Sequence, residues 1–372
     1  MAGDISRRTL LAGLAASACG KKRASRYSGW LFVASRGGKS VAVADLAYFR
    51  RTTTIPLDSA PEQLFEAVGR VFAVCHDGQV LAEIDPHSLR EVAKIRLPGK
   101  PAAARITGNG LAVILTDQPN LLLAVDLSQR RVIGRLPLPA AASDLDINEG
   151  QAAVAVPTRN SIIRINLPGL NLTGTTDVGV PCATLRFRRD GKTILAGSPS
   201  AREIVSIDCA TGKLLALLPL PIAPSRFCFN GNGGQMFVTG TGEDAVAIVK
   251  PFQNEVDQTI LAGRTPYAMA VSENLLFVTN LESGDLTILD IETRSPAATV
   301  HVGENPGEVL LTPDGQYALV IDPRTGNVSV VRIPTVLDHD PGALGKVRAK
   351  PLFTVFPTAA DARSAIIVPF GA

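Results

Sequence analysis

The sequence predicts an all-β protein built as a single β-propeller of eight four-stranded blades. Three sets of markers lead to this prediction: a proline that opens each unit, an apolar strand that follows it, and a strand that ends in Asp or a substitute. All three recur about every 40 residues, and a four-stranded unit repeated at that period is typical of a propeller. The composition agrees, because 33 Gly and 26 Pro suit short strands joined by tight turns.

The opening proline stands before the first strand of each unit. Successive markers lie 40 to 43 residues apart, except for a last step of 51 residues. The extra length falls in the segment TVLDHDPGALGKVRAK, which we expect to be a solvated loop. The markers, including the one slot without a proline, are Pro61, Pro101, Ala141, Pro181, Pro224, Pro266, Pro306 and Pro357.

The apolar strand and the strand after it complete the repeat, as in LLFVTN and DLTILD. An Asp at the end of the third strand can accept hydrogen bonds from backbone N–H groups of the following turn, so we interpret it as structural. Counting these strand ends gives eight units, or seven if one degenerate copy does not form a blade. The strand ends are Asp45, Asp85, Asp126, Asn166, Asp208, Lys250, Asp290 and Arg332.

The two ends of the repeat region are complementary. The chain enters at Trp30 on a second strand, so the first unit lacks its opening strand. The C-terminal stretch PTAADARSAIIV begins with the same pattern of proline and small residues as other opening strands. It can therefore supply the missing strand, close the ring non-covalently and remove an exposed sheet edge. The propeller is expected to span 29–372.

The copy FVTNLESGDLTILDIET, which ends at Thr293, resembles the YVTN family of propeller repeats. The strands LFVAS, MFVTG and ALVID are looser versions of the same motif. The resemblance implies a propeller that is extracytoplasmic or surface-associated, with a role in binding or with no assigned role. Many members of the family have seven blades, so the predicted count of eight departs from the usual pattern.

The N-terminus predicts export. SRRTLL within residues 1–19 resembles a twin-arginine signal, and the apolar run after it suits a signal h-region. The residues before Cys19 resemble a lipobox with Ala16 in place of the usual Leu, and they also fit an ordinary cleavage site. Residues 20–28 form a basic tether that would add to anchoring if Cys19 is acylated. We therefore expect a periplasmic or cell-surface protein anchored through a lipid on Cys19; the alternative is a disordered N-terminus with coincidental arginines.

Several chemistries lack their sequence signals. The net charge of +3 argues against a nucleic-acid surface. The five cysteines form no metal or haem pattern, and the four histidines are scattered. Asp338, His339 and Asp340 are consecutive and have no partners elsewhere in the sequence, so we predict no metal site there. We also predict no cofactor and no catalytic residues, since the chain has one Trp, no G-x-S-x-G elbow and no phosphate loop.

The remaining candidates lie at one end of the expected central channel, where the turns before each opening strand gather. Most residues after the opening markers are small, including Thr358 after the last one, and the exceptions are Glu62, Arg226, Tyr267 and Glu308. We predict that these four bind a protein, a glycan or a small ligand, so that the protein is a non-catalytic binding or scaffold propeller. Three alternatives are open: polar side chains that only line a wet channel, a lactonase-type hydrolase, and a cytoplasmic scaffold with an intact N-terminus.

Overall fold

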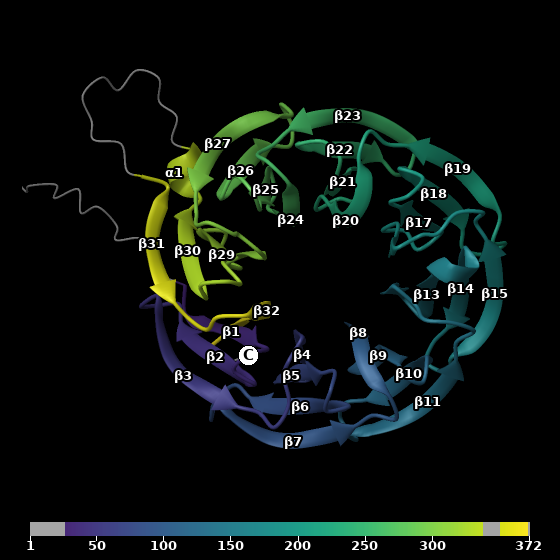
Figure 1. The fold of residues 1–372 in the computed structure, drawn as a ribbon, viewed down its shortest axis with the longest axis horizontal. Coiled ribbons are helices and arrows are strands. Elements are labelled where there is room, and N and C mark those ends of the chain that lie inside the picture. Colours follow the sequence, from purple (N-terminus) through teal and green to yellow (C-terminus); the bar gives the residue numbers. More distant parts are fainter. Residues whose placement is uncertain (1–26, 338–349, 371–372) are drawn as a thin grey trace, which may run out of the picture.

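The computed structural model describes residues 27–337 and 350–370. The predictions for three segments fall outside this range: the export signal at 1–19 with Cys19, all but the last two residues of the basic tether, and Asp338, His339 and Asp340. The described chain folds into eight four-stranded antiparallel sheets, arranged as the blades of a closed ring (Figure 1). The predictions of an all-β propeller and of eight blades are therefore confirmed.

Each blade runs from an inner strand at the ring axis to an outer strand at the perimeter (Figure 1). The inner strands are β4 (Gln63–Ala67), β8 (Lys100–Ile106), β12 (Asp144–Asn148), β16 (Thr184–Phe187), β20 (Ala223–Phe229), β24 (Pro266–Val271), β28 (Val309–Leu311) and β32 (Ala362–Pro369). The second strands are β1 (Gly29–Ser35), β5 (Arg70–Cys75), β9 (Leu111–Asp117), β13 (Gln151–Val156), β17 (Thr193–Ser198), β21 (Met236–Thr241), β25 (Leu275–Asn280) and β29 (Tyr317–Ile321).

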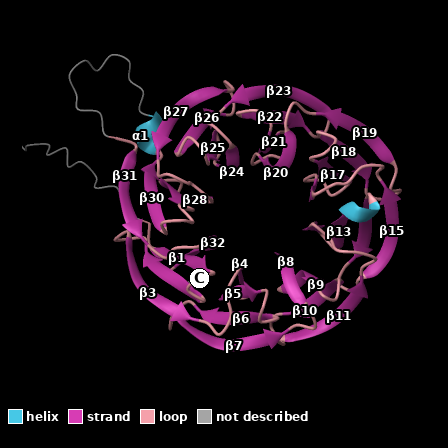
Figure 2. Ribbon diagram, viewed as in Figure 1, coloured by secondary structure: helices cyan, strands magenta, loops and turns pink. Residues whose placement is uncertain are grey.

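The third strands all end at the predicted residues: β2 (Ser40–Asp45), β6 (Val80–Asp85), β10 (Leu121–Asp126), β14 (Ser161–Asn166), β18 (Glu203–Asp208), β22 (Ala245–Lys250), β26 (Asp285–Asp290) and β30 (Asn327–Arg332). The outer strands are β3 (Arg50–Pro56), β7 (Arg90–Arg96), β11 (Arg131–Pro137), β15 (Asn171–Asp177), β19 (Leu214–Pro219), β23 (Glu255–Leu261), β27 (Ser295–His301) and β31 (Leu352–Pro357). Blades 1 to 8 are numbered from the sheet that contains β1. Helix is confined to a 3₁₀ turn (Pro157–Arg159) and α1 (Pro334–Leu337) within the described ranges (Figure 2).

The Asp residues that end third strands do accept hydrogen bonds from the next turn, as predicted. Asp208 Oδ1 accepts from the backbone N–H of Thr211 at 2.7 Å, and Asp290 Oδ1 accepts from that of Thr293 at 2.7 Å. These hydrogen bonds lower the pKa of both carboxyl groups below the ordinary value. The repeated Asp is thus explained by local turn structure.

The ring closes as expected, but from a different starting residue. β32 pairs antiparallel with β1, with Trp30 opposite Val368 and Phe32 opposite Ile366. Pro357 does not open this strand: it is the last residue of β31, and β32 begins at Ala362. The marker was wrong because the connection between the two strands contains further small residues that mimic the opening pattern.

The core consists of eight apolar clusters of buried side chains, typically drawn from two neighbouring sheets. Strands of the two middle layers are buried on both faces, as in β1, where six of the seven residues are buried. Outer strands instead alternate, as in β7, where Ile95 is buried and both its neighbours are exposed. This pattern follows from the geometry, because only the perimeter strand has one face toward solvent. Among the described residues, no helix has the length and apolar character to cross a membrane.

Candidate functional site

A cavity of about 280 Å³ lies against the inner strands of blades 6, 7, 8 and 1. Its walls come from the starts of the inner strands and the ends of the second strands, which antiparallel pairing places at the same end of the ring. We call it the axial pocket. Its charged and polar lining consists of Arg226, Tyr267, Asn305, Glu308, Arg363 and Ser364, and the rest of the lining of Leu281, Gly307, Ile321, Pro323 and Ala362.

Arg226 on β20 and Tyr267 on β24 form one wall of the pocket. The guanidinium carbon of Arg226 lies 4.0 Å from the centre of the Tyr267 ring, and Nη2 donates a hydrogen bond to the phenol oxygen. A guanidinium stacked on an aromatic face is held in one orientation by cation–π attraction. Arg226 forms no ion pair with any acidic group of the described chain, so its charge is balanced by no protein carboxylate in direct contact.

Glu308, just before β28, is the acidic residue of the lining. Its Oε2 accepts a hydrogen bond from the backbone N–H of Ala365 on β32 at 2.9 Å. Burial raises the pKa of this carboxyl group above its ordinary value, opposed by that hydrogen bond and by the charge of Arg226. Like Arg226, Glu308 makes no direct ion pair within the described residues. The lining of this pocket therefore includes a cation and an acid that form no ion pair within the described residues.

The repeated threonine near the end of the second strand positions the lining of the pocket. Thr279, the Thr of FVTN at the end of β25, donates a hydrogen bond to the carbonyl oxygen of Gly307 at 2.8 Å. Thr239 holds the equivalent place in MFVTG and donates to the carbonyl oxygen of Tyr267 at 2.7 Å. In both cases the threonine of one blade fixes the inner strand of the next. The motif thus contributes to the pocket through the backbone of its lining residues.

Three of the four residues predicted to bind ligand, Arg226, Tyr267 and Glu308, are brought together in this pocket. The fourth, Glu62, lies outside its lining, at the start of blade 2. Its carboxylate lies 3.0 Å from Nε of Arg36 and 4.0 Å from Nε of Arg363, so it contacts a pocket residue rather than the pocket.

Sequence reasoning missed Arg363 because the last opening marker was placed too early. Thr358, the residue after that marker, donates instead to the carbonyl oxygen of Gly326, outside the pocket lining. The apolar run AIIV marks the closing strand, β32, but it does not report which residue ahead of it reaches the pocket. Arg363 falls at the register shift of β32 against β1, between Ala362 opposite Ser35 and Ser364 opposite Ala34.

A second group of charges lies on the inner strands of blades 3, 4 and 5, and the sequence markers missed it as well. Asp144 on β12 accepts from Nη1 of Arg186 at 2.7 Å and from Nη2 of Arg105 at 3.3 Å. Burial raises the pKa of the nearby Asp146 and lowers the pKa of Arg105. Here each charge is matched by a neighbour, so this group ties three inner strands together and leaves no charge free for a ligand.

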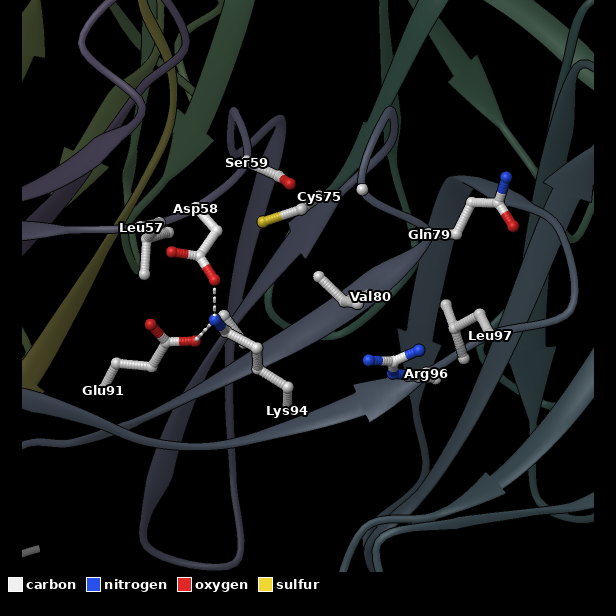
Figure 3. A pocket seen from close by; sticks show the side chains of 12 residues that line it. Leu57, Asp58, Ser59, Cys75, Gln79, Val80, Glu91, Lys94, Arg96 and Leu97 are labelled. Atoms are coloured by element: carbon white, nitrogen blue, oxygen red, sulfur yellow. Dashed lines mark hydrogen bonds and ion pairs between the residues drawn. The ribbon is translucent and has the colours of Figure 1, made fainter.

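A larger cavity of about 430 Å³ lies between blades 1 and 2, away from the axis (Figure 3). In it the amine of Lys94 lies between the carboxylates of Asp58 and Glu91, so these charges satisfy one another. Burial raises the pKa of the Cys75 thiol to about 12, which leaves it protonated and unreactive at neutral pH. We therefore place the candidate site in the axial pocket, where opposite charges remain unpaired.

Within residues 27–337 and 350–370, no three His, Cys, Asp or Glu side chains are grouped so that they could hold a metal ion. The described free cysteines are Cys75, Cys182, Cys209 and Cys228.

Comparison with known proteins supports the fold. No protein-family model matches the chain. A stretch of 162 residues is 25% identical to a protein of Mycobacterium tuberculosis described as a seven-bladed β-propeller protein, and it covers 41% of this chain and 40% of that protein. The match thus spans less than half the length of that relative.

Solved structures are similar over more of the chain. Dihydro-heme d1 dehydrogenase NirN in complex with DHE gives a TM-score of 0.73 at 14% identity, over 91% of this chain and 74% of that one. Apo AztD from Citrobacter koseri gives a TM-score of 0.65 at 15% identity, over 92% and 98% of the two chains. At such low identity these similarities concern the fold alone. Taken with the eight sheets, they identify the chain as a β-propeller protein.

Proposed function

We propose that this protein is an exported propeller of the YVTN type that binds a small polar ligand in the axial pocket. The observation that carries the proposal is that Arg226 and the half-buried Glu308 line one cavity, and neither forms an ion pair within the described residues. Charged side chains that serve only structure are usually paired, as in the group around Asp144. Charges kept apart at a shared cavity are instead typical of a preformed binding site.

The pocket also has the walls that a small ligand requires. Leu281, Ile321 and Pro323 supply apolar surface, while Asn305 and Ser364 supply hydrogen-bonding groups. A volume of about 280 Å³ lies at the small end of the range for ligand pockets, which run from about 300 to 1,000 Å³. The pocket is therefore better suited to a small metabolite than to a glycan chain or a protein surface.

Binding is tested by adding fractionated small-molecule extract to the full chain and recording the thermal midpoint. A fraction that binds should raise the midpoint. The apparent affinity derived from this shift should be at least about tenfold weaker in Arg226→Gln, because the variant loses a charged contact. Arg294→Gln removes an arginine whose partner is Asp257, outside the pocket, and should leave the shift unchanged. A shift that survives Arg226→Gln would exclude the axial pocket.

Export and anchoring are proposed from the sequence resemblance at the N-terminus. Labelling cells with a radioactive fatty acid should mark the wild-type protein and leave Cys19→Ser unlabelled. Replacing Arg7 and Arg8 by Lys should retain the protein in the cytoplasm if the twin-arginine signal is used. An unprocessed N-terminus, found by mass spectrometry of the purified protein, would contradict both steps.

A further inference from the structure

The charges around the axial pocket define which ligand it would select, if the binding function proposed above holds. Two cationic side chains line it, but only one is available. Arg363 contacts Asp361 at 3.0 Å and Glu62 at 4.0 Å, so its charge is already shared between two carboxylates. Within the described ranges, the Arg226 guanidinium has one side-chain hydrogen-bond partner, Tyr267, on whose ring it also stacks. The remaining N–H groups of Arg226 are therefore the ones that can receive an anionic ligand group.

The acid of the pocket is available in the same way. The one hydrogen bond found for the side chain of Glu308 among the described residues comes from the backbone N–H of Ala365. A carboxylate has about four lone-pair sites on its two oxygens, so most of its accepting capacity remains. A cationic donor placed in the pocket would satisfy it and offset the burial of its charge.

The two groups are also fixed in space relative to each other. Arg226 stands on β20, whose backbone pairs with Thr239 of β21 at that residue. Glu308 is held by its own backbone, which accepts from the N–H of Ile321 at 3.0 Å, and by the side-chain hydrogen bond to β32. The backbone of each residue is thus held by its sheet, and each side chain is oriented by its own contact, Arg226 by Tyr267 and Glu308 by the backbone N–H of Ala365. A ligand that contacts both groups would carry an anionic group for Arg226 and a cationic group for Glu308.

We infer that the axial pocket selects a small dipolar ion, with a carboxylate at Arg226 and the Tyr267 hydroxyl and a protonated amine at Glu308. The Tyr267 oxygen accepts from Arg226, so its own hydrogen is free to donate to the ligand carboxylate. The hydroxyl of Ser364 accepts from the backbone N–H of Leu64 at 3.2 Å, which leaves its hydrogen free to donate to the ligand as well. The ligand class is that of free amino acids.

The test is a calorimetric titration of the full chain with a series of unbranched ω-amino acids, from glycine to 6-aminohexanoate. Each is paired with the carboxylic acid and the amine of the same chain length, which carry one charge only. We expect one or two lengths to bind with a 1:1 ratio, at least tenfold more tightly than both single-charge controls. The preferred length reports the separation of the two charged walls.

Two substitutions test which charged group of the ligand binds to Glu308 and which binds to Arg226. Glu308→Gln keeps an oxygen for the Ala365 N–H, and it should reduce the affinity for the best amino acid at least tenfold while leaving the affinity for the matched carboxylic acid unchanged. Arg226→Gln should reduce the affinity for both. Glu292→Gln, in the exposed turn after β26, is the control for loss of an acidic group and should change neither.

The outcomes separate this inference from the proposed function. If an extract fraction gives a shift that depends on Arg226 while no amino acid binds, the pocket is a binding site and the dipolar class is wrong. The class is also wrong if the carboxylic acids bind as tightly as the amino acids. If neither the extract nor the amino acids bind, both the function and the class are overturned.

Discussion

Glu83 on β6 is buried, and its carboxylate lies between arginines of two blades. Oε2 accepts from Nε of Arg130 at 2.6 Å and Oε1 from Nη2 at 2.9 Å, while Arg70 lies 3.6 Å away on the neighbouring strand. The side chain of Glu83 is 4% exposed and that of Arg130 is 53% exposed. The pair therefore joins blades 2 and 3 through one group that cannot reach water and one that can.

This difference in exposure predicts which of two substitutions lowers the stability of the protein more. Arg130→Ala leaves a buried carboxylate with only the more distant Arg70, so it should lower the unfolding free energy by more than removal of the carboxylate itself does. Glu83→Ala releases Arg130 into solvent and should cost less, about 1–2 kcal/mol. Denaturant unfolding of the two variants measures the difference. Equal costs, or the reverse order, would show that the buried carboxylate is not what makes this contact important.

Glu308 gives the pocket a defined dependence on pH. Its pKa is raised on folding, mainly by burial, so the folded protein binds this proton more tightly than the unfolded chain does. The stability that it contributes is fully present below its ordinary value of 4.5 and is lost as the pH rises through the raised pKa. Arg226 opposes the shift, and the other charged group that lines the pocket, Arg363, is already paired.

The variant Glu308→Gln cannot lose this proton. The difference in thermal midpoint, variant minus wild type, should therefore increase between acidic and neutral pH, and calorimetric scans across that range measure it. Gln also preserves an acceptor for Ala365, so the comparison isolates the charge. A difference that stays constant or decreases with pH would mean that burial does not raise the pKa of the Glu308 carboxyl group.

At the scale of single elements, the second strand carries the threonine that fixes the next blade. Thr279 is fully buried; its hydroxyl donates to Gly307 and accepts from the backbone N–H of Ala268 at 3.1 Å. Thr279→Val keeps the shape and leaves both backbone groups unpaired, which should cost about 1–3 kcal/mol. Thr299→Val on the exposed face of β27 is the matched control and should be nearly neutral. Equal midpoints for the two variants would show that the motif does not fasten the blades.

The closing strand β32 is the other element whose role can be tested alone. Val368 is 1% exposed and packs in the cluster between blades 1 and 2. Val368→Asp places a charge there and should cost more than about 3 kcal/mol or prevent folding. The same change at Val92, 50% exposed on β7, should stay within about 0.5 kcal/mol. A folded Val368→Asp protein of unchanged midpoint would mean that β32 does not seal the ring.

The strands also show which features of the structure could be predicted from the sequence. The ends of the third strands were predictable because Asp serves a local turn, and local chemistry repeats with the unit. Three pocket residues were predictable because they follow correctly placed prolines. Arg363 and the group around Asp144 were not, because their contacts join strands that lie some 40 or more residues apart, and no periodicity reports which side chain meets which across the axis. Whether Arg226 and Glu308 form ion pairs likewise could not be predicted without the folded structure.

At the scale of the molecule, the ring itself creates the pocket. Blades 6, 7 and 8 supply Arg226, Tyr267 and Glu308, and β32 of blade 1 supplies Arg363 and Ser364. The pocket therefore spans the junction between the first and last blades, where the ring is held by hydrogen bonds and packing. The relative in Mycobacterium tuberculosis is described as seven-bladed, but the match of 162 residues covers only about four repeats and does not fix a blade count.

The central claim is a ring of eight blades, closed by β32, in which Arg226 and Glu308 line one pocket without forming an ion pair with each other. A crystal structure of the full chain tests it most directly. We expect eight four-stranded sheets, β32 paired with β1 in the register that sets Trp30 opposite Val368, and no ion pair between Arg226 and Glu308 in the unliganded protein. A ring of seven blades, a C-terminal strand paired elsewhere, or a direct Arg226–Glu308 ion pair would contradict it.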